Sequence, residues 1–129
     1  MIIEPAIDLK DGKVVRLLKG DFDTVHKVAE NPIVTAQAFA AAGAKYIHMV
    51  DLDGAKSGRR VNSAIVKAVA DRTGMKIELG GGIRCMADLE AVFAMGVWRA
   101  VIGSAAVTDP DFVRAAVERY GERIAVGVD

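Results

Sequence analysis

Two aspartates stand at the ends of short apolar runs, where a carboxylate can move protons. Asp8 ends a run near the start of the chain, and Asp129 ends the run over residues 124–128. The carboxyl ends of strands are where α/β proteins place their chemistry. A carboxylate that is partly shielded from water there suits general acid or base work. A single strand-end aspartate more often caps a turn, but the pair favours a catalytic interpretation.

Two glycine-bearing segments between these aspartates could bind an anion. Gly81 and Gly82 follow one apolar run, and Gly103 and Ser104 follow the next. Glycine lets backbone N–H groups approach an anion closely, a hydroxyl adds a donor, and Arg84 could reach a phosphate. Neither segment is a dinucleotide fingerprint or a P-loop, and each alone could equally be a tight turn.

Metal-ligating residues are sparse in this sequence. Asp51 and Asp53 could bind a cation, but two carboxylates without further ligands favour structural hydrogen bonds. Cys85 is the only cysteine, and it forms no spaced metal cluster with His26 and His48. His48 lies within an apolar run, which favours a core histidine over a catalytic one. We therefore expect no metal site.

The segments that must position these residues alternate between strand-like and helix-like patterns. Strands are predicted over residues 2–8, 13–18, 46–50, 76–79, 100–102 and 124–128. Helices are predicted over residues 32–42, 62–72 and 87–95, and from the segment 108–111 up to Gly121. One helix between successive later strands is a βα series, which predicts a parallel sheet.

Two helix starts carry capping signals. Asn31 precedes Pro32, which places a capping side chain before a proline at the first helical position. The segment from Thr108 to Asp111 is of the capping-box kind, with Asp111 in the role usually given to Glu.

Length and composition indicate one domain with a sizeable core. The chain has 129 residues, of which 52% are hydrophobic and 26% charged. Its 17 basic and 17 acidic side chains balance, so neither nucleic acid nor an anionic membrane is expected as a partner. No apolar stretch is long enough to span a membrane, and no signal peptide is evident. These features, with the single cysteine, predict a cytoplasmic protein.

Four segments in order, residues 5–13, 48–55, 79–84 and 102–107, closely resemble the phosphoribosylformimino-5-aminoimidazole carboxamide ribotide isomerase family of histidine biosynthesis. The resemblance implies an α/β fold of the (β/α)₈ TIM-barrel type. It also implies an Amadori rearrangement of an N-substituted phosphoribosyl aminoaldose to the aminoketose (ProFAR to PRFAR), without cofactor or metal. The expected partner is a phosphorylated sugar.

The family's site residues match this sequence residue by residue. The general base on the first strand corresponds to Asp8, and the general acid ending the fifth strand corresponds to Asp129. The strand ends that bind one substrate phosphate correspond to Gly81, Gly82, Gly103 and Ser104.

The chain length departs from that family, since a complete barrel needs about 250 residues. Residues 1–129 are therefore expected to form one incomplete domain, a half-barrel of four βα units plus a fifth strand. Two unpaired sheet edges and an apolar inner face predict self-association, and little or no activity as a monomer.

Other interpretations remain open. The related cyclase of imidazole glycerol phosphate synthase usually carries a cysteine before the first aspartate, where Ala6 and Ile7 stand here. A second alternative is an isomerase that also accepts phosphoribosyl anthranilate. A third alternative is a non-catalytic half-barrel that self-associates. A doubly wound nucleotide-binding domain would require a fingerprint after the first strand, and none is present.

Overall fold

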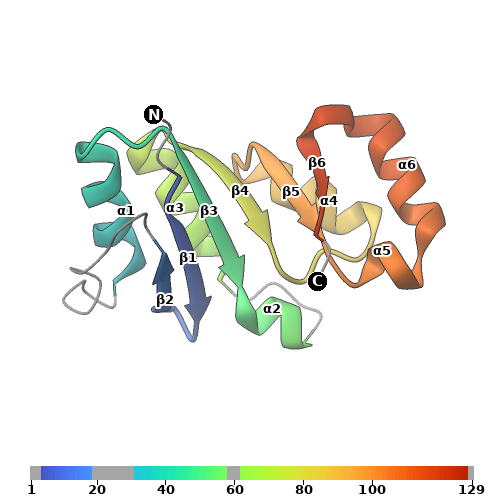
Figure 1. Cartoon of the computed structure of the whole chain (residues 1–129), viewed down its shortest axis with the longest axis horizontal. Coiled ribbons are helices and arrows are strands. Elements are labelled where there is room, and N and C mark those ends of the chain that lie inside the picture. The colour runs from blue at the N-terminus through green and yellow to red at the C-terminus, as the bar shows by residue number, and fades with distance from the viewer. Residues whose placement is uncertain (1–3, 19–30, 58–61, 128–129) are drawn as a thin grey trace.

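Six strands form one sheet in the order β2-β1-β3-β4-β5-β6. The computed structural model describes residues 4–18, 31–57 and 62–127 (Figure 1). The strands are β1 Ala6–Lys10, β2 Lys13–Leu18, β3 Tyr46–Asp51, β4 Lys76–Gly80, β5 Arg99–Ile102 and β6 Ile124–Val126. The β1–β2 pair is an antiparallel hairpin, and every other neighbouring pair is parallel. The predicted α/β series and its parallel sheet are confirmed.

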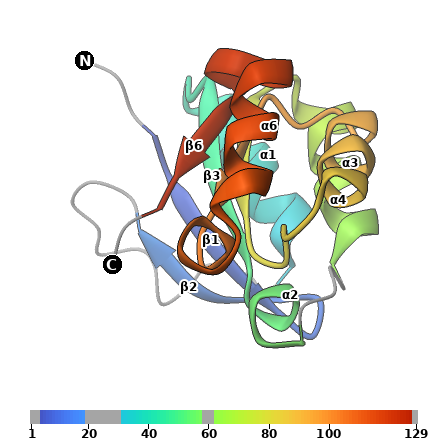
Figure 2. The same ribbon diagram turned by 90° about the vertical axis from the view of Figure 1, so that its right-hand side faces the viewer.

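Helices follow the parallel strands in turn. They are α1 Pro32–Ala41, α2 Leu52–Ser57, α3 Ser63–Thr73, α4 Met86–Ala94, α5 Ala105–Thr108 and α6 Pro110–Tyr120, with a 3₁₀ turn at Gly121–Arg123. The four longer helices, α1, α3, α4 and α6, lie on one face of the sheet (Figure 2). The short α2 and α5 were not expected, and they follow the carboxyl ends of β3 and β5. Among the described helices, none has the length and hydropathy needed to cross a bilayer.

The helix starts agree with the capping signals at one site and differ at the other. The Asn31 side chain accepts hydrogen bonds from the backbone N–H groups of Ile33 at 2.9 Å and Val34 at 3.2 Å, as predicted. At α6 the cap is Asp109, which accepts from the Phe112 N–H at 3.1 Å. Thr108 instead ends α5, because Pro110 occupies the first position of α6 and leaves the residue before it as the cap.

The core lies between the sheet and its helices. Alternate residues of the parallel strands point to the helices and are buried, namely Ile7, Leu9, Ile47, Met49, Ile77, Leu79, Ala100 and Ile102. Helix residues such as Val66, Val69, Leu89 and Val92 complete the cluster. This burial stabilises the curved sheet through one face alone.

The opposite face of the sheet carries two rows of residues set by the strand register. The row nearer the carboxyl ends consists of Asp8, Val50, Gly80, Val101 and Ala125. The row beneath consists of Ala6, His48, Glu78 and Arg99. No described helix covers this open face (Figure 2). Five parallel strands with helices on the outer face correspond to part of a TIM barrel, as the sequence predicted.

Candidate active site

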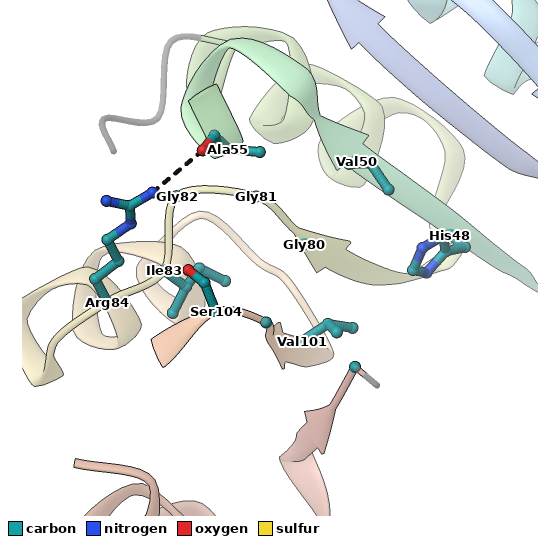
Figure 3. A pocket seen from close by; sticks show the side chains of 12 residues that line it. His48, Val50, Ala55, Gly80, Gly81, Gly82, Ile83, Arg84, Val101 and Ser104 are labelled. Carbon is teal, nitrogen blue, oxygen red and sulfur yellow. Dashed lines mark hydrogen bonds between the residues drawn. The ribbon is translucent and has the colours of Figure 1, made fainter. Parts of the chain in front are cut away.

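A pocket of about 330 Å³ lies at the carboxyl ends of β3, β4 and β5 (Figure 3). Its lining residues are His48, Val50, Ala55, Gly80, Gly81, Gly82, Ile83, Arg84, Val101, Gly103, Ser104 and Gly127. All five residues predicted to bind a phosphate, Gly81, Gly82, Arg84, Gly103 and Ser104, are therefore brought together. The volume lies at the lower end of the range for small-molecule sites.

Gly81 and Gly82 are required by the backbone. Both have positive φ, +102° and +79°, which a side chain disfavours. A Cβ on Gly81 would collide with the Asp51 carbonyl oxygen, and one on Gly82 would lie 3.1 Å from Gly54. The loop after β4 can pass this close to the end of β3 because both residues lack side chains. The same bare main chain borders the pocket.

The segment after β5 supplies the other border of the pocket. Gly103 has no heavy atom within 4 Å of where its Cβ would lie, so its backbone is open to a ligand. Ser104 precedes α5, but its side chain makes no capping hydrogen bond to that helix. Its hydroxyl lines the pocket beside the glycine loop (Figure 3).

Arg84 contributes a positive charge at the rim. Its Nη2 donates a hydrogen bond to the Ala55 carbonyl oxygen at 3.2 Å, which joins the glycine loop to α2 (Figure 3). Its backbone N–H donates to the Asp88 carboxylate at 2.9 Å. The first bond holds the guanidinium next to the pocket, where it favours an anionic ligand, and the second fixes the Arg84 backbone beside the start of α4.

Of the two predicted catalytic aspartates, only Asp8 belongs to the described part of the chain, and it does not line this pocket. Asp8 is half-buried on the open face, directly across from Val50, which does line it. Asp129 lies outside the described residues. Gly127, two positions before it, borders the pocket. The approach of the two carboxylates to one another stays a prediction.

Asp51 and Asp53 make structural hydrogen bonds, as the sequence favoured. Asp51 is 1% exposed, and it accepts from the N–H of Gly54 at 2.8 Å and the N–H of Asn62 at 2.9 Å. The Asn62 amide also donates to Asp51 at 2.8 Å and to Asp53 at 3.1 Å. These N–H donors occupy the carboxylate oxygens that a cation would need.

The same asparagine reaches the β1–β2 turn. The Gly12 N–H donates to Asn62 Oδ1 at 2.9 Å, and the Asp11 N–H donates to Asp53 at 2.7 Å. We call Asp11, Gly12, Asp51, Asp53 and Asn62 the Asn62 clasp. It fastens the strand that carries Asp8 to the end of β3 and the start of α3.

His48 was misjudged from the sequence as a core histidine. It lies on the open face and lines the pocket, with its Nδ1 2.7 Å from Glu78 Oε1. The other Glu78 oxygen lies 3.6 Å from Arg99 Nη1. The apolar neighbours of His48 hid this role, because no signal in a single sequence tells which face of a parallel strand is open.

Two other hollows of similar size lie away from the predicted site residues. One, of about 330 Å³, lies between the β1–β2 turn and α1 and includes Asn31. The other, of about 350 Å³, lies at the amino ends of β3 and β4. Neither contains a predicted phosphate ligand, so the pocket at the carboxyl ends is the candidate active site.

Comparison with known proteins finds relatives that match the whole length of this chain. The chain is 50% identical over 129 residues to the 1-(5-phosphoribosyl)-5-((5-phosphoribosylamino)methylideneamino)imidazole-4-carboxamide isomerase of Listeria monocytogenes, covering 100% of this chain and 54% of the relative. The isomerase of the same name from Clostridium acetobutylicum is also 50% identical, over the same shares. That of Geobacillus kaustophilus is 47% identical over 127 residues, covering 98% of this chain and 52% of the relative.

The chain thus spans about half the length of the curated relatives it matches. The model of one protein family, described as histidine biosynthesis protein, matches residues 2–129. The mostly parallel sheet with its helices is consistent with that match. The chain belongs to the histidine biosynthesis protein family.

Proposed function

We propose that this chain forms part of an isomerase that converts an N-substituted phosphoribosyl aminoaldose to the corresponding aminoketose in histidine biosynthesis. The single observation that carries the proposal is the pocket in which Gly81, Gly82, Arg84, Gly103 and Ser104 meet. The names of the relatives give the reaction class and a phosphoribosyl substrate. A phosphate is the group that bare main chain, a hydroxyl and a guanidinium would recognise.

In this proposal the two predicted aspartates share the proton transfers. Asp129 protonates the ribose ring oxygen, so that the ring C–O bond breaks and a protonated imine forms. Asp8 then removes the proton from the neighbouring carbon, which gives an enolamine that collapses to the ketose. The position of Asp8, next to Val50 on the open face, supports its part in this sequence. Each transfer would contribute a factor of about 10²–10⁴ to the rate.

We further propose that the 129-residue chain has little or no activity as a monomer. Its open face leaves Asp8 half-exposed, while a catalytic carboxylate needs a site that excludes water. The remaining strands would come from the part of the relatives that this chain does not match.

Activity is tested by expressing the chain alone, and together with the unmatched half of the Listeria monocytogenes relative, in a bacterium that lacks the isomerase. We expect growth without histidine in the second case and not in the first. Product formation by the purified complex gives the rate. Rapid turnover by a verified monomer of 129 residues would refute the proposed inactivity.

A titration with inorganic phosphate tests the site independently of turnover. We expect the amide resonances of Gly81, Gly82 and Ser104 to shift together in NMR spectra, with those of the α1–β3 connection unchanged. A complex that shows neither turnover nor phosphate-dependent shifts at these residues would contradict the proposed function.

A further inference from the structure

Gly80 is a glycine that the fold does not require. Unlike Gly81 and Gly82, it has no positive φ, and a Cβ there would meet Val101 at an ordinary contact distance of 3.5 Å. Glycine inside a strand weakens it, because the unfolded chain loses more freedom and no side chain packs. A strand glycine without a conformational reason often marks the close approach of a ligand.

The missing side chain opens the pocket to the row beneath. Gly80 follows Glu78 on the same face of β4, and its register partner on β3 is Val50. His48, the partner of Glu78, belongs to the lower row, yet it lines the pocket. Figure 3 shows the His48 ring on one side of Gly80 and Arg84 on the other. A ligand held near Arg84 would cross Gly80 to reach the imidazole.

Glu78 fixes the orientation of that ring. Its Oε1 lies 2.7 Å from His48 Nδ1, and its Oε2 lies 3.6 Å from Arg99 Nη1. A carboxylate can only accept, so Nδ1 donates the hydrogen bond. The other ring nitrogen, Nε2, has no hydrogen-bond partner among the described residues. A hydroxyl group both donates and accepts, so it can form a hydrogen bond with this nitrogen whether or not the nitrogen carries a proton.

We propose that His48 Nε2 forms a hydrogen bond with a hydroxyl of the phosphorylated sugar, that Gly80 is the opening that admits this hydroxyl, and that Glu78 is the positioning residue for the ring. This rests on the proposed phosphate site, because the phosphate places the sugar over Gly80. The His48 contact distinguishes a phosphorylated sugar from phosphate itself. It also explains a polar row beneath an otherwise apolar part of the open face.

The test compares two probes, inorganic phosphate and ribose 5-phosphate, by calorimetric titration of the full chain. We expect Gly80→Ala and His48→Ala each to weaken the binding of ribose 5-phosphate about tenfold, which is the effect of losing one hydrogen bond. The affinity of both variants for inorganic phosphate is expected to stay within about twofold of that of the unchanged chain. The double variant is expected to bind ribose 5-phosphate as tightly as either single variant, because the two substitutions remove the same contact. Gly103→Ala, in the phosphate site, is expected to weaken both probes alike.

Glu78→Gln tests the positioning role. The amide can donate as well as accept, so it no longer fixes the ring, and ribose 5-phosphate binding is expected to fall severalfold with phosphate binding unchanged. Glu90→Gln is the matched control, because Glu90 is exposed on α4 and pairs with Arg119. His48→Gln retains a polar atom near the Nε2 position and is expected to recover part of the loss seen with His48→Ala.

Each outcome decides between distinct claims. Equal weakening of both probes, or undiminished ribose 5-phosphate binding in His48→Ala, would overturn the hydroxyl contact while leaving the phosphate site intact. Failure of the unchanged chain to bind either probe would overturn the phosphate site and this proposal with it. Thermal unfolding of each variant separates a lost contact from a lost fold, and His48→Gln carries the test should Gly80→Ala not fold.

Discussion

Asp8 differs in charge from the residues beside it in the row nearer the carboxyl ends of the strands. Its neighbours across the open face, Val50, Gly80 and Val101, carry no charge, and the polar side chains of His48, Glu78 and Arg99 lie one row deeper. A ligand on the upper row would therefore meet one carboxylate supplied by the described strands. A carboxylate at this place on the open face suits a group that accepts a proton from carbon.

Replacing Asp8 by Asn tests that role in the complex of the two halves. We expect kcat to fall by about 10²–10⁴ with KM changed only severalfold, because the amide keeps the shape and loses the base. Steady-state product formation measures both constants. Asp71→Asn is the control, since Asp71 is exposed and pairs with Lys67 on α3. A kcat within tenfold of the unchanged complex would contradict a general-base role.

The adjacent glycines of the loop should differ in what they do for stability. Gly81→Ala is expected to lower the free energy of unfolding by about 2 kcal/mol or more, because φ is +102° and the Cβ would strike Asp51. Gly80→Ala is expected to leave it unchanged or raise it by about 0.5–1 kcal/mol. Urea unfolding followed by Trp98 fluorescence measures both. Equal losses in the two variants would contradict the assignment of Gly80 to ligand access.

At the scale of secondary-structure elements, the Asn62 clasp connects three segments of the chain. It joins the β1–β2 turn, the end of β3 and the start of α3 through one buried side chain. The buried Asp51 carboxylate depends on these donors, because an ionised group without partners is costly to bury. The clasp thereby sets the strand of Asp8 against the glycine loop.

Asn62→Ala should therefore destabilise the protein strongly, although it removes only an uncharged side chain. We expect a loss of about 2–4 kcal/mol in the free energy of unfolding, because the buried Asp51 oxygens lose a donor and Gly12 loses an acceptor. The denaturation midpoint and the amide exchange of Gly12 measure it. Gln37→Ala, exposed on α1, provides the comparison and is expected to change little. A loss no greater than that of Gln37→Ala would contradict the role of the clasp.

Local chemistry predicted most of these elements, and tertiary context decided the rest. Asn31 before Pro32 identifies a helix start because both signals are local. The capping side chain and the fixed φ of proline affect only the first turn of the helix. The short α2 was missed because Gly54 lowers its helix propensity, while Asp51 caps it from the preceding strand. At α6, two capping side chains compete, and the sequence alone favoured Thr108 over Asp109.

The part of the site that depends on backbone conformation was predictable from the sequence. The part that depends on which face of the sheet a side chain occupies was not. Gly81 and Gly82 stand out because consecutive glycines at a strand end have few explanations besides a tight approach. The strand pairing that brings Gly103 and Ser104 to the same pocket followed from the βα series. The face of His48 could not be read, because β3 has apolar residues on both sides and the register is set by neighbouring strands.

At the scale of the whole molecule, the sheet ends in two outer strands, β2 and β6. Val126 on β6 is 45% exposed, and the open face carries Val50 and Val101 without a described covering helix. Exposed edges and apolar faces favour association. We propose that copies of this chain, taken alone, pair through these surfaces.

Light scattering after size exclusion checks this. We expect a mean mass above that of one chain, which rises with concentration, because the buried apolar area drives pairing. Val126→Lys is expected to shift the distribution toward the monomer, since a charge on an edge strand opposes pairing. Val107→Lys is the control, because Val107 is 85% exposed and lies on the helix α5 and not on an edge strand. A single-chain mass at every concentration would contradict the proposal.

The alternation of the strands has a consequence for how such a protein can change over time. Positions that pack against the helices stabilise the fold, and the intervening positions, such as 48, 50, 78 and 80, lie on the open face of the sheet, where we propose that the ligand binds. Mutations at the second set can therefore explore new specificities while the scaffold persists. A library randomised at those positions should yield many folded members with altered ligand preference, and one randomised at Ile47, Met49, Ile77 and Leu79 should yield few folded members.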